Sequence, residues 1–173
     1  MRCITNSEFV NWCGKNGINV PLSGAADFEK GNNYRVITET PTYSRTKKAI
    51  LRELFEFYEK GSDFYVQLRC WNEASLDGGV VDLILALRRQ HGEARHLSEA
   101  PVHLFSAKEV ELCLGFIDLV LAFDWEAVWL PTTACNVIWA QVDEHLILVA
   151  NERELFQKIT KQMSATGTVF KEF

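Results

Sequence analysis

The chain has 173 residues, of which 47% are hydrophobic and 24% are charged. This composition is typical of a folded globular protein and excludes collagen-like, mucin-like and intrinsically disordered classes. A chain of this length predicts one domain, which buries enough apolar surface to fold without a metal ion or a disulfide bond.

The formal net charge is -5, and it is unevenly distributed along the chain. Residues 1–60 contain 9 basic and 7 acidic side chains, residues 61–125 contain 5 and 10, and residues 126–173 contain 4 and 6. The acidic field of the last two segments repels nucleic acid and favours a partner with a basic surface. The plainer interpretation is that these charges keep the protein dissolved.

The five cysteines are odd in number and contain no C-x-x-C spacing, so we expect neither a disulfide framework nor a zinc site. Free thiols are typical of the reducing cytoplasm. Residues 1–8 lack the apolar core of a signal peptide, and the most apolar stretch, Leu112 to Phe123, is too short to span a bilayer. We therefore expect a soluble cytoplasmic protein that takes no cofactor and does not associate with a membrane.

The first third of the chain predicts a helix, a loop, a strand and a second helix. Ser7 is expected to cap the first helix, which ends near Cys13, and residues 1–33 are expected to form an N-terminal helix and loop appendage. Residues 34–39 are β-rich, and apolar side chains at helical spacing predict a helix from Ser44 to about Lys60.

A second strand is predicted from Phe64 to Cys70, where successive side chains alternate between two faces. In this alternation Cys70 faces inward, and we expect it in the core. The order strand, helix, strand predicts a right-handed crossover between residues 34–39 and 64–70, which would pair the two strands in parallel.

Two helices follow in the middle of the chain. Asp77 is expected to cap the first, which ends at His91 and Gly92. Ser106 and Glu109 match the S-x-x-E capping box that opens the second. The second helix is apolar on nearly every side, which predicts a central position with four largely buried side chains: Leu114, Phe116, Ile117 and Leu121.

The last third predicts an antiparallel meander, because short loops connect three β-rich segments: 127–130, 136–142 and 145–150. A final helix begins after Asn151, residues 164–173 form a tail that is expected to fray, and within it residues 168–173 are an alternative short edge strand. We therefore expect a single α+β domain over residues 1–173, with a mixed, mainly antiparallel sheet of about five strands packed by four to five helices.

Known catalytic motifs are absent from the sequence: it has no G-x-S-x-G, no P-loop, no dinucleotide-binding glycine motif and no H-E-x-x-H. Two weaker candidates remain. Asp143, Glu144 and His145 cluster at the predicted hairpin turn, where a carboxylate beside an imidazole could act as a general base, although turns favour these residue types for conformational reasons. Cys135, in a loop between strands, is the cysteine that we expect to be exposed.

Four tryptophans lie on or beside predicted strands: Trp71, Trp125, Trp129 and Trp139. We expect Trp129 and Trp139 to pair across the meander, on the side opposite to four aliphatic residues: Ile138, Ala140, Leu146 and Leu148. Outside the core, these tryptophans would form a binding face, whereas beneath a helix they would belong to the core.

These observations favour a non-catalytic binding or regulatory protein that neutralises a basic protein partner, as immunity proteins do for toxins, an analogy of class only. The candidate binding residues combine aromatic and charged positions: Trp71, Trp125, Glu126, Trp129, Trp139, Asp143, Glu144 and His145. One alternative is an enzyme that uses Cys135 or His145 with a neighbouring carboxylate. Another is a small-ligand module with its pocket between the meander and the Leu112–Phe123 helix.

Overall fold

The computed structural model describes residues 1–21, 24–39, 51, 61–71, 78–133, 136–165, 168, 169, 171 and 172. The helix expected at 44–60 lies outside the described residues, except for Leu51, which is helical and buried. None of the helices that the described residues form is long and apolar enough to cross a membrane.

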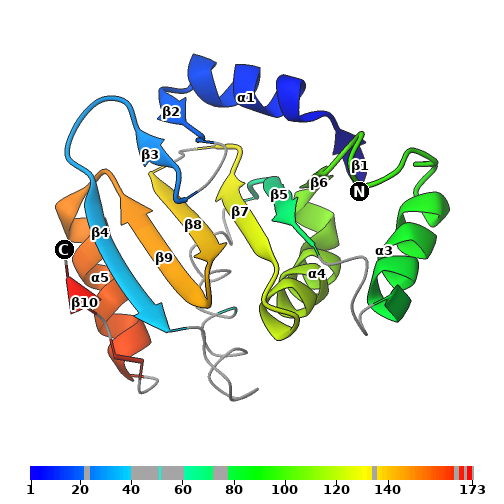
Figure 1. The fold of residues 1–173 in the computed structure, drawn as a ribbon. Coiled ribbons are helices and arrows are strands. Elements are labelled where there is room, and N and C mark those ends of the chain that lie inside the picture. The colour runs from blue at the N-terminus through cyan, green and yellow to red at the C-terminus, as the bar shows by residue number, and fades with distance from the viewer. Residues whose placement is uncertain are drawn as a thin grey trace.

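The elements follow in this order (Figure 1): β1 (Arg2–Ile4), α1 (Asn6–Lys15), β2 (Ile18–Asn19), β3 (Asp27–Phe28), β4 (Tyr34–Glu39), β5 (Phe64–Cys70), α3 (Gly78–Gln90), β6 (Val102–Phe105), the short helical turn η1 (Ala107–Glu109), α4 (Val110–Ala122), β7 (Glu126–Pro131), β8 (Val137–Val142), β9 (His145–Ala150), α5 (Arg153–Ala165) and β10 (Lys171–Glu172).

Eight of the described strands form one sheet in the order β1-β6-β5-β7-β8-β9-β4-β10, and β2 and β3 form a separate pair. Together with the helices they make an α+β architecture, as the sequence predicts (Figure 1). The main sheet has more strands than expected because β1, β6 and β10 contain only two to four residues each. Segments so short do not show a periodic pattern.

All pairings in the main sheet are antiparallel. The predicted parallel pair of β4 and β5 is therefore wrong: β4 pairs with β9 and β10, whereas β5 pairs with β6 and β7. The physical reason is that the meander β7-β8-β9 lies between the two strands and offers a partner edge to each. The order strand, helix, strand does not by itself make two strands neighbours.

The two faces of the sheet are covered by different elements (Figure 1). Side chains of α3, α4 and α5 pack on one face into the larger cluster of buried residues, which includes Val66 and Phe116. The helix α1 and the β2–β3 pair pack on the other face, around Phe9 and Tyr65. Tyr65 and Val66, adjacent in β5, face opposite sides as the pleat of a strand requires.

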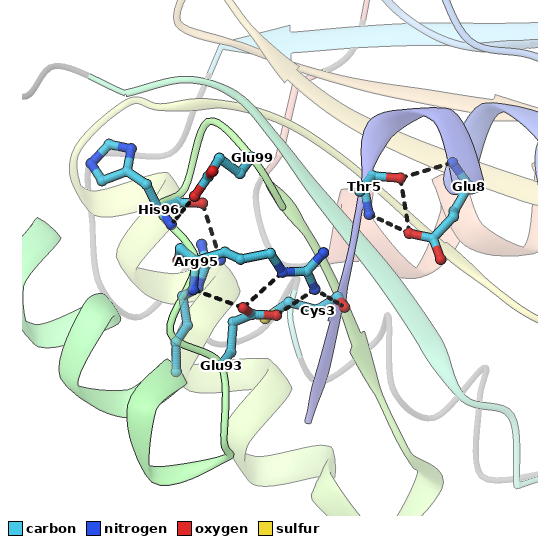
Figure 2. Close-up of polar contacts among 8 residues, drawn as sticks. Cys3, Thr5, Glu8, Glu93, Arg95, His96 and Glu99 are labelled. Atoms are coloured by element: carbon cyan, nitrogen blue, oxygen red, sulfur yellow. Dashed lines mark hydrogen bonds and ion pairs between the residues drawn. The ribbon is translucent and has the colours of Figure 1, made fainter.

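Residues 1–33, expected as an appendage, contribute to the sheet and to one covering layer. The strand β1 pairs with β6, and Phe9 of α1 is completely buried. The capping residue of α1 is Thr5, not the expected Ser7 (Figure 2). The Thr5 hydroxyl accepts a hydrogen bond of 3.2 Å from the Glu8 amide, and the Glu8 carboxylate accepts one of 2.7 Å from the Thr5 amide. This reciprocal pair is a capping box, which the sequence T-x-x-E from Thr5 to Glu8 forms two residues before Ser7.

The capping box predicted at Ser106 is confirmed. The Glu109 carboxylate accepts hydrogen bonds from the Ser106 amide, at 2.9 Å, and from its hydroxyl, at 2.8 Å. Of the four side chains predicted as largely buried on α4, three are buried and Leu114 is only partly so. The difference arises because Leu114 borders the outer stripe of α4, on which Glu111 and Gly115 are exposed.

The predicted three-strand meander is confirmed as β7, β8 and β9. Trp129 lies opposite Trp139 in the pairing of β7 and β8. Asp143 and Glu144 form the two-residue turn between β8 and β9, with φ angles of 46° and 62°. Positive φ at both central positions is the signature of a type I′ turn, whose twist matches that of the flanking strands.

Some side chains lie on unexpected sides of their strands. The turn sets Leu148 opposite Trp139, so Leu148 and Leu146 share the tryptophan side of the sheet, and the prediction of the opposite side is wrong. Cys70 is exposed, not in the core as predicted. The pairing of β5 with β7 shifts between Leu68 and Cys70, and this irregularity ends the alternation on which the prediction relied.

Candidate functional site

The topology gathers carboxylates at one end of the main sheet, the lower end in Figure 1. There β4 ends, β7 begins, and the turn joins β8 to β9. These strands are neighbours in the sheet. We call the five carboxylates at this end the acidic rim: Glu39, Asp124, Glu126, Asp143 and Glu144. Three of them belong to the binding residues that the sequence predicts.

The rim carboxylates are accessible, since four are exposed and Glu126 is partly buried. None of them forms an ion pair with a described residue. The rim also contains every non-glycine residue of the described chain with a positive φ: Asp124, Asp143 and Glu144. This conformation is unfavourable for glutamate and persists only where the surrounding structure imposes it. The main chain that carries these three carboxylates is therefore set by the fold.

His145 lies at the rim, opposite Glu39 in the pairing of β4 and β9. Its Nδ1 is 2.5 Å from the main-chain carbonyl oxygen of Asp143, so the imidazole can donate to that oxygen and stabilise the turn. This contact does not form the imidazole–carboxylate pair that the enzyme hypothesis needs. Cys135, the other candidate of that hypothesis, lies outside the described residues.

The tryptophans of the meander belong to the core. Trp125, Trp129 and Trp139 are at most 2% exposed and pack in the larger cluster, on the sheet face that the helices cover. The interpretation of these side chains as a binding face is therefore wrong, because they cannot contact a partner without unfolding. Trp71, beyond the end of β5, is partly buried and packs against the same cluster.

A second polar cluster, which the sequence reasoning missed, lies between α3 and the β1 edge of the sheet. Arg88, in the last turn of α3, donates hydrogen bonds from Nη2 to the carbonyls of Arg95, at 3.1 Å, and His96, at 3.3 Å. Figure 2 shows the next link: the Arg95 guanidinium donates to the Cys3 carbonyl at 3.1 Å and to the Glu93 carboxylate at 2.6 Å. These bonds fix the loop between α3 and β6 against the outer edge of β1.

His103 of β6 is fully buried, opposite Cys3 in the pairing of β1 and β6, and its ring packs against that of Phe116 with 4.5 Å between the ring centroids. Burial, and after it the charge of Arg88, lowers the pKa of His103 to about 3, so the imidazole is neutral at pH 7. Burial raises the pKa of the Cys3 thiol. A protonated, buried thiol lacks the ionised form that nucleophilic catalysis needs. The apolar run Val102–Phe105 around His103 is the signal that could have indicated its burial.

A groove of about 600 Å³ lies between β4, α5 and residues 168–169, lined by Val36, Gln157, Thr160, Lys161, Ser164, Thr168 and Val169. Its position differs from the small-ligand pocket predicted between the meander and α4, where the described side chains pack into the larger cluster.

Within the described part of the chain, no group of three or more histidine, cysteine or acidic residues is arranged to hold a metal ion. No protein-family model matches the chain, and comparisons with characterised proteins and with solved structures found no match.

Proposed function

We propose that this protein is a non-catalytic binding or regulatory protein of the cytoplasm that uses the acidic rim to bind a basic surface of another protein and thereby neutralises or regulates it. The observation that carries the proposal is the convergence of five carboxylates at one end of the sheet, with no ion pair to a described residue. Carboxylates held close together repel one another, and a cationic partner relieves that repulsion.

The rim is supported by rigid structure. The strands β7, β8 and β9 are buried along most of their length, and the Asp143–Glu144 turn has only two residues. Because the supporting main chain is already ordered, binding of a partner costs little main-chain entropy at the rim. A rim on such a base is suited to recognition of lysine and arginine side chains on a complementary surface.

Charge, not aromatic contact, would dominate the recognition, because the meander tryptophans are buried. Electrostatic complementarity raises the association rate more than it raises the final affinity. Salt screens exposed charges over about 8–10 Å at physiological ionic strength. We therefore expect association with the partner to be fast at low salt and to slow steeply as salt is added.

The test compares affinity capture from a lysate of the source organism with three baits. The first is the wild-type protein, and the second is the rim variant Glu126→Lys/Asp143→Lys/Glu144→Lys. The third is a control of equal net charge in which three exposed carboxylates outside the rim are replaced: Glu29→Lys/Asp82→Lys/Glu111→Lys. Circular dichroism establishes that each bait is folded.

Wild-type protein and control should retain the same basic protein, which elutes as the salt concentration rises, and the rim variant should lose it. With the purified partner, the rim variant should associate at least about tenfold more slowly at low salt. Capture of identical proteins by all three folded baits would contradict the proposal. Loss of the partner from rim variant and control alike would also contradict it, because net charge alone would then explain binding.

A further inference from the structure

The end of α1 contains an asparagine that is followed by a glycine. Asn16 precedes Gly17, and none of the other asparagines in the sequence precedes a glycine. In such a pair the main-chain nitrogen of the glycine can attack the side-chain carbonyl carbon of the asparagine and close a five-membered ring. Glycine favours this attack, because it has no side chain to obstruct the nitrogen and its main chain rotates most freely.

The folded structure opposes ring closure at this pair. Asn16 is the exposed C-cap residue of α1, with a φ of -101° and a ψ of 11°. Its Nδ2 donates a hydrogen bond of 2.8 Å to the carbonyl of Trp12, one helical turn earlier. The Gly17 amide donates one of 3.2 Å to the carbonyl of Gly14. The attacking nitrogen and the side-chain amide that it must reach are therefore bound to two different carbonyls of α1.

These two hydrogen bonds depend on the last turn of α1. Gly14 lies in that turn and is exposed, and glycine inside a helix makes the helix less stable than alanine does. Helix ends open and close much faster than an asparagine side chain cyclises. The rate of ring closure therefore follows the fraction of molecules in which this turn is open.

We propose that Asn16 is a site of spontaneous deamidation whose rate is set by the opening of the last turn of α1, and that its isoaspartate product loosens the β2–β3 pair. In the open turn, a bond forms between the Gly17 nitrogen and the side-chain carbonyl carbon of Asn16. The proton of that nitrogen passes through solvent to the side-chain amide group, which leaves as ammonia. Water then adds to one of the two ring carbonyl carbons and breaks its bond to the nitrogen, which gives aspartate or isoaspartate.

Both products change the junction between α1 and β2. Each replaces the Asn16 amide with a carboxylate, which cannot donate to the Trp12 carbonyl and is unfavourable at the C-terminal end of a helix. Isoaspartate also lengthens the main chain by one methylene group. The Gly17 carbonyl accepts a hydrogen bond of 2.8 Å from the Glu29 amide, which connects the segments that carry β2 and β3. The longer main chain moves the Gly17 carbonyl away from this amide. This site is separate from the acidic rim and does not depend on the proposed function.

The first test follows deamidation by peptide mapping while the folded proteins are incubated at neutral pH. Gly14→Ala strengthens the last turn of α1, whereas Gly115→Ala makes the same change at an exposed position of α4. Neither added Cβ would meet another atom within 4 Å, so both variants should fold. Gly14→Ala should slow deamidation of Asn16 about two- to fivefold, and Gly115→Ala should leave its rate unchanged.

The same measurement on the wild-type chain in guanidinium chloride gives the rate without α1. Asn16 should react at least about tenfold faster there than in the folded protein. Equal rates in folded wild type and Gly14→Ala would overturn the proposal, as would equal rates in the folded and the unfolded chain. Equal slowing by Gly14→Ala and Gly115→Ala would also overturn it, because global stability would then set the rate.

The second test examines the product. The isoaspartate form is separated by chromatography, and hydrogen exchange is measured at the Glu29 amide. This amide should lose protection in the isoaspartate form but keep it in Asn16→Asp, which has the same charge and a main chain of normal length. Equal protection of the Glu29 amide in the two proteins would overturn the proposed effect on the β2–β3 pair.

Discussion

Gln141, buried near the end of β8, donates a hydrogen bond of 2.5 Å from its side-chain amide to the carboxylate of Asp124. Asp124 has a φ of 52°, so this bond holds a strained residue in place between α4 and β7. We predict that Asp124→Ala destabilises the protein by about 2 kcal/mol, because it removes a hydrogen bond to a charged group. Asp124→Asn keeps an acceptor oxygen and should cost clearly less in urea denaturation. Equal losses in the two variants would contradict the prediction that an acceptor oxygen at position 124 preserves most of the stability.

The turn between β8 and β9 offers a stabilising substitution. Glu144 has a φ of 62°, a conformation that glycine adopts without strain. We predict that Glu144→Gly raises the free energy of unfolding by about 0.5–1 kcal/mol, whereas Glu144→Ala, which keeps a Cβ, does not. The urea midpoints of the two variants provide the comparison. A lower midpoint for the glycine variant would contradict the left-handed conformation.

Buried His103 predicts a specific dependence of stability on pH. Its pKa is about 3 in the folded state and 6.5 in the unfolded state, so the unfolded chain binds a proton first as the pH falls. Stability should be highest above pH 6.5 and should fall by about 1.4 kcal/mol per pH unit between about pH 6 and pH 3. His103→Leu should remove this contribution. Urea denaturation of the wild type and of His103→Leu at pH 7, 6 and 5 measures how the free energy of unfolding of each protein changes with pH, above the pH range in which most carboxylates titrate. The same change with pH in both proteins would refute the prediction.

The core under α4 can be tested with two equivalent truncations. Leu121 is 2% exposed, whereas Leu114 is only partly buried. We predict that Leu121→Ala costs about 2–5 kcal/mol, through lost burial and a residual cavity, and that Leu114→Ala costs less than half as much. Chemical denaturation measures both. A larger loss of unfolding free energy for Leu114→Ala would contradict the exposure of the outer side of α4, on which Glu111 and Gly115 lie.

Local signals in the sequence predicted local structure well. The Ser106–Glu109 capping box and the Asp143–Glu144 turn each depend on residues within a few positions of one another, and both are present. The exposure of Cys70 was not predictable, because it follows from a shift in pairing with β7. Side-chain alternation describes one strand and contains no information about the partner's register.

Long-range features of the site were predictable only in part. The sequence indicates Glu126, Asp143 and Glu144, but Glu39 joins them only because β4 pairs with β9 in the register that sets it opposite His145. Which face of the meander is covered depends on where α4 packs, so the burial of the tryptophans could not be decided from the pattern of the strands. Pairing and docking of distant segments depend on which edges and faces remain available after local structure has formed.

The strand order has a consequence for how a new chain reaches its folded state. Consecutive strands β7, β8 and β9 lie in the middle of the sheet, whereas β1 and β4, from the start of the chain, lie at or next to its two edges. Their partners β6 and β9 are much later in the sequence. On the ribosome, β1 and β4 are therefore synthesised before the segments with which they pair. The strand β1 gains its partner with β6, but β4 stays open to pairing with other chains until β9 is made, so conditions that slow translation of the last third should increase aggregation of the nascent protein.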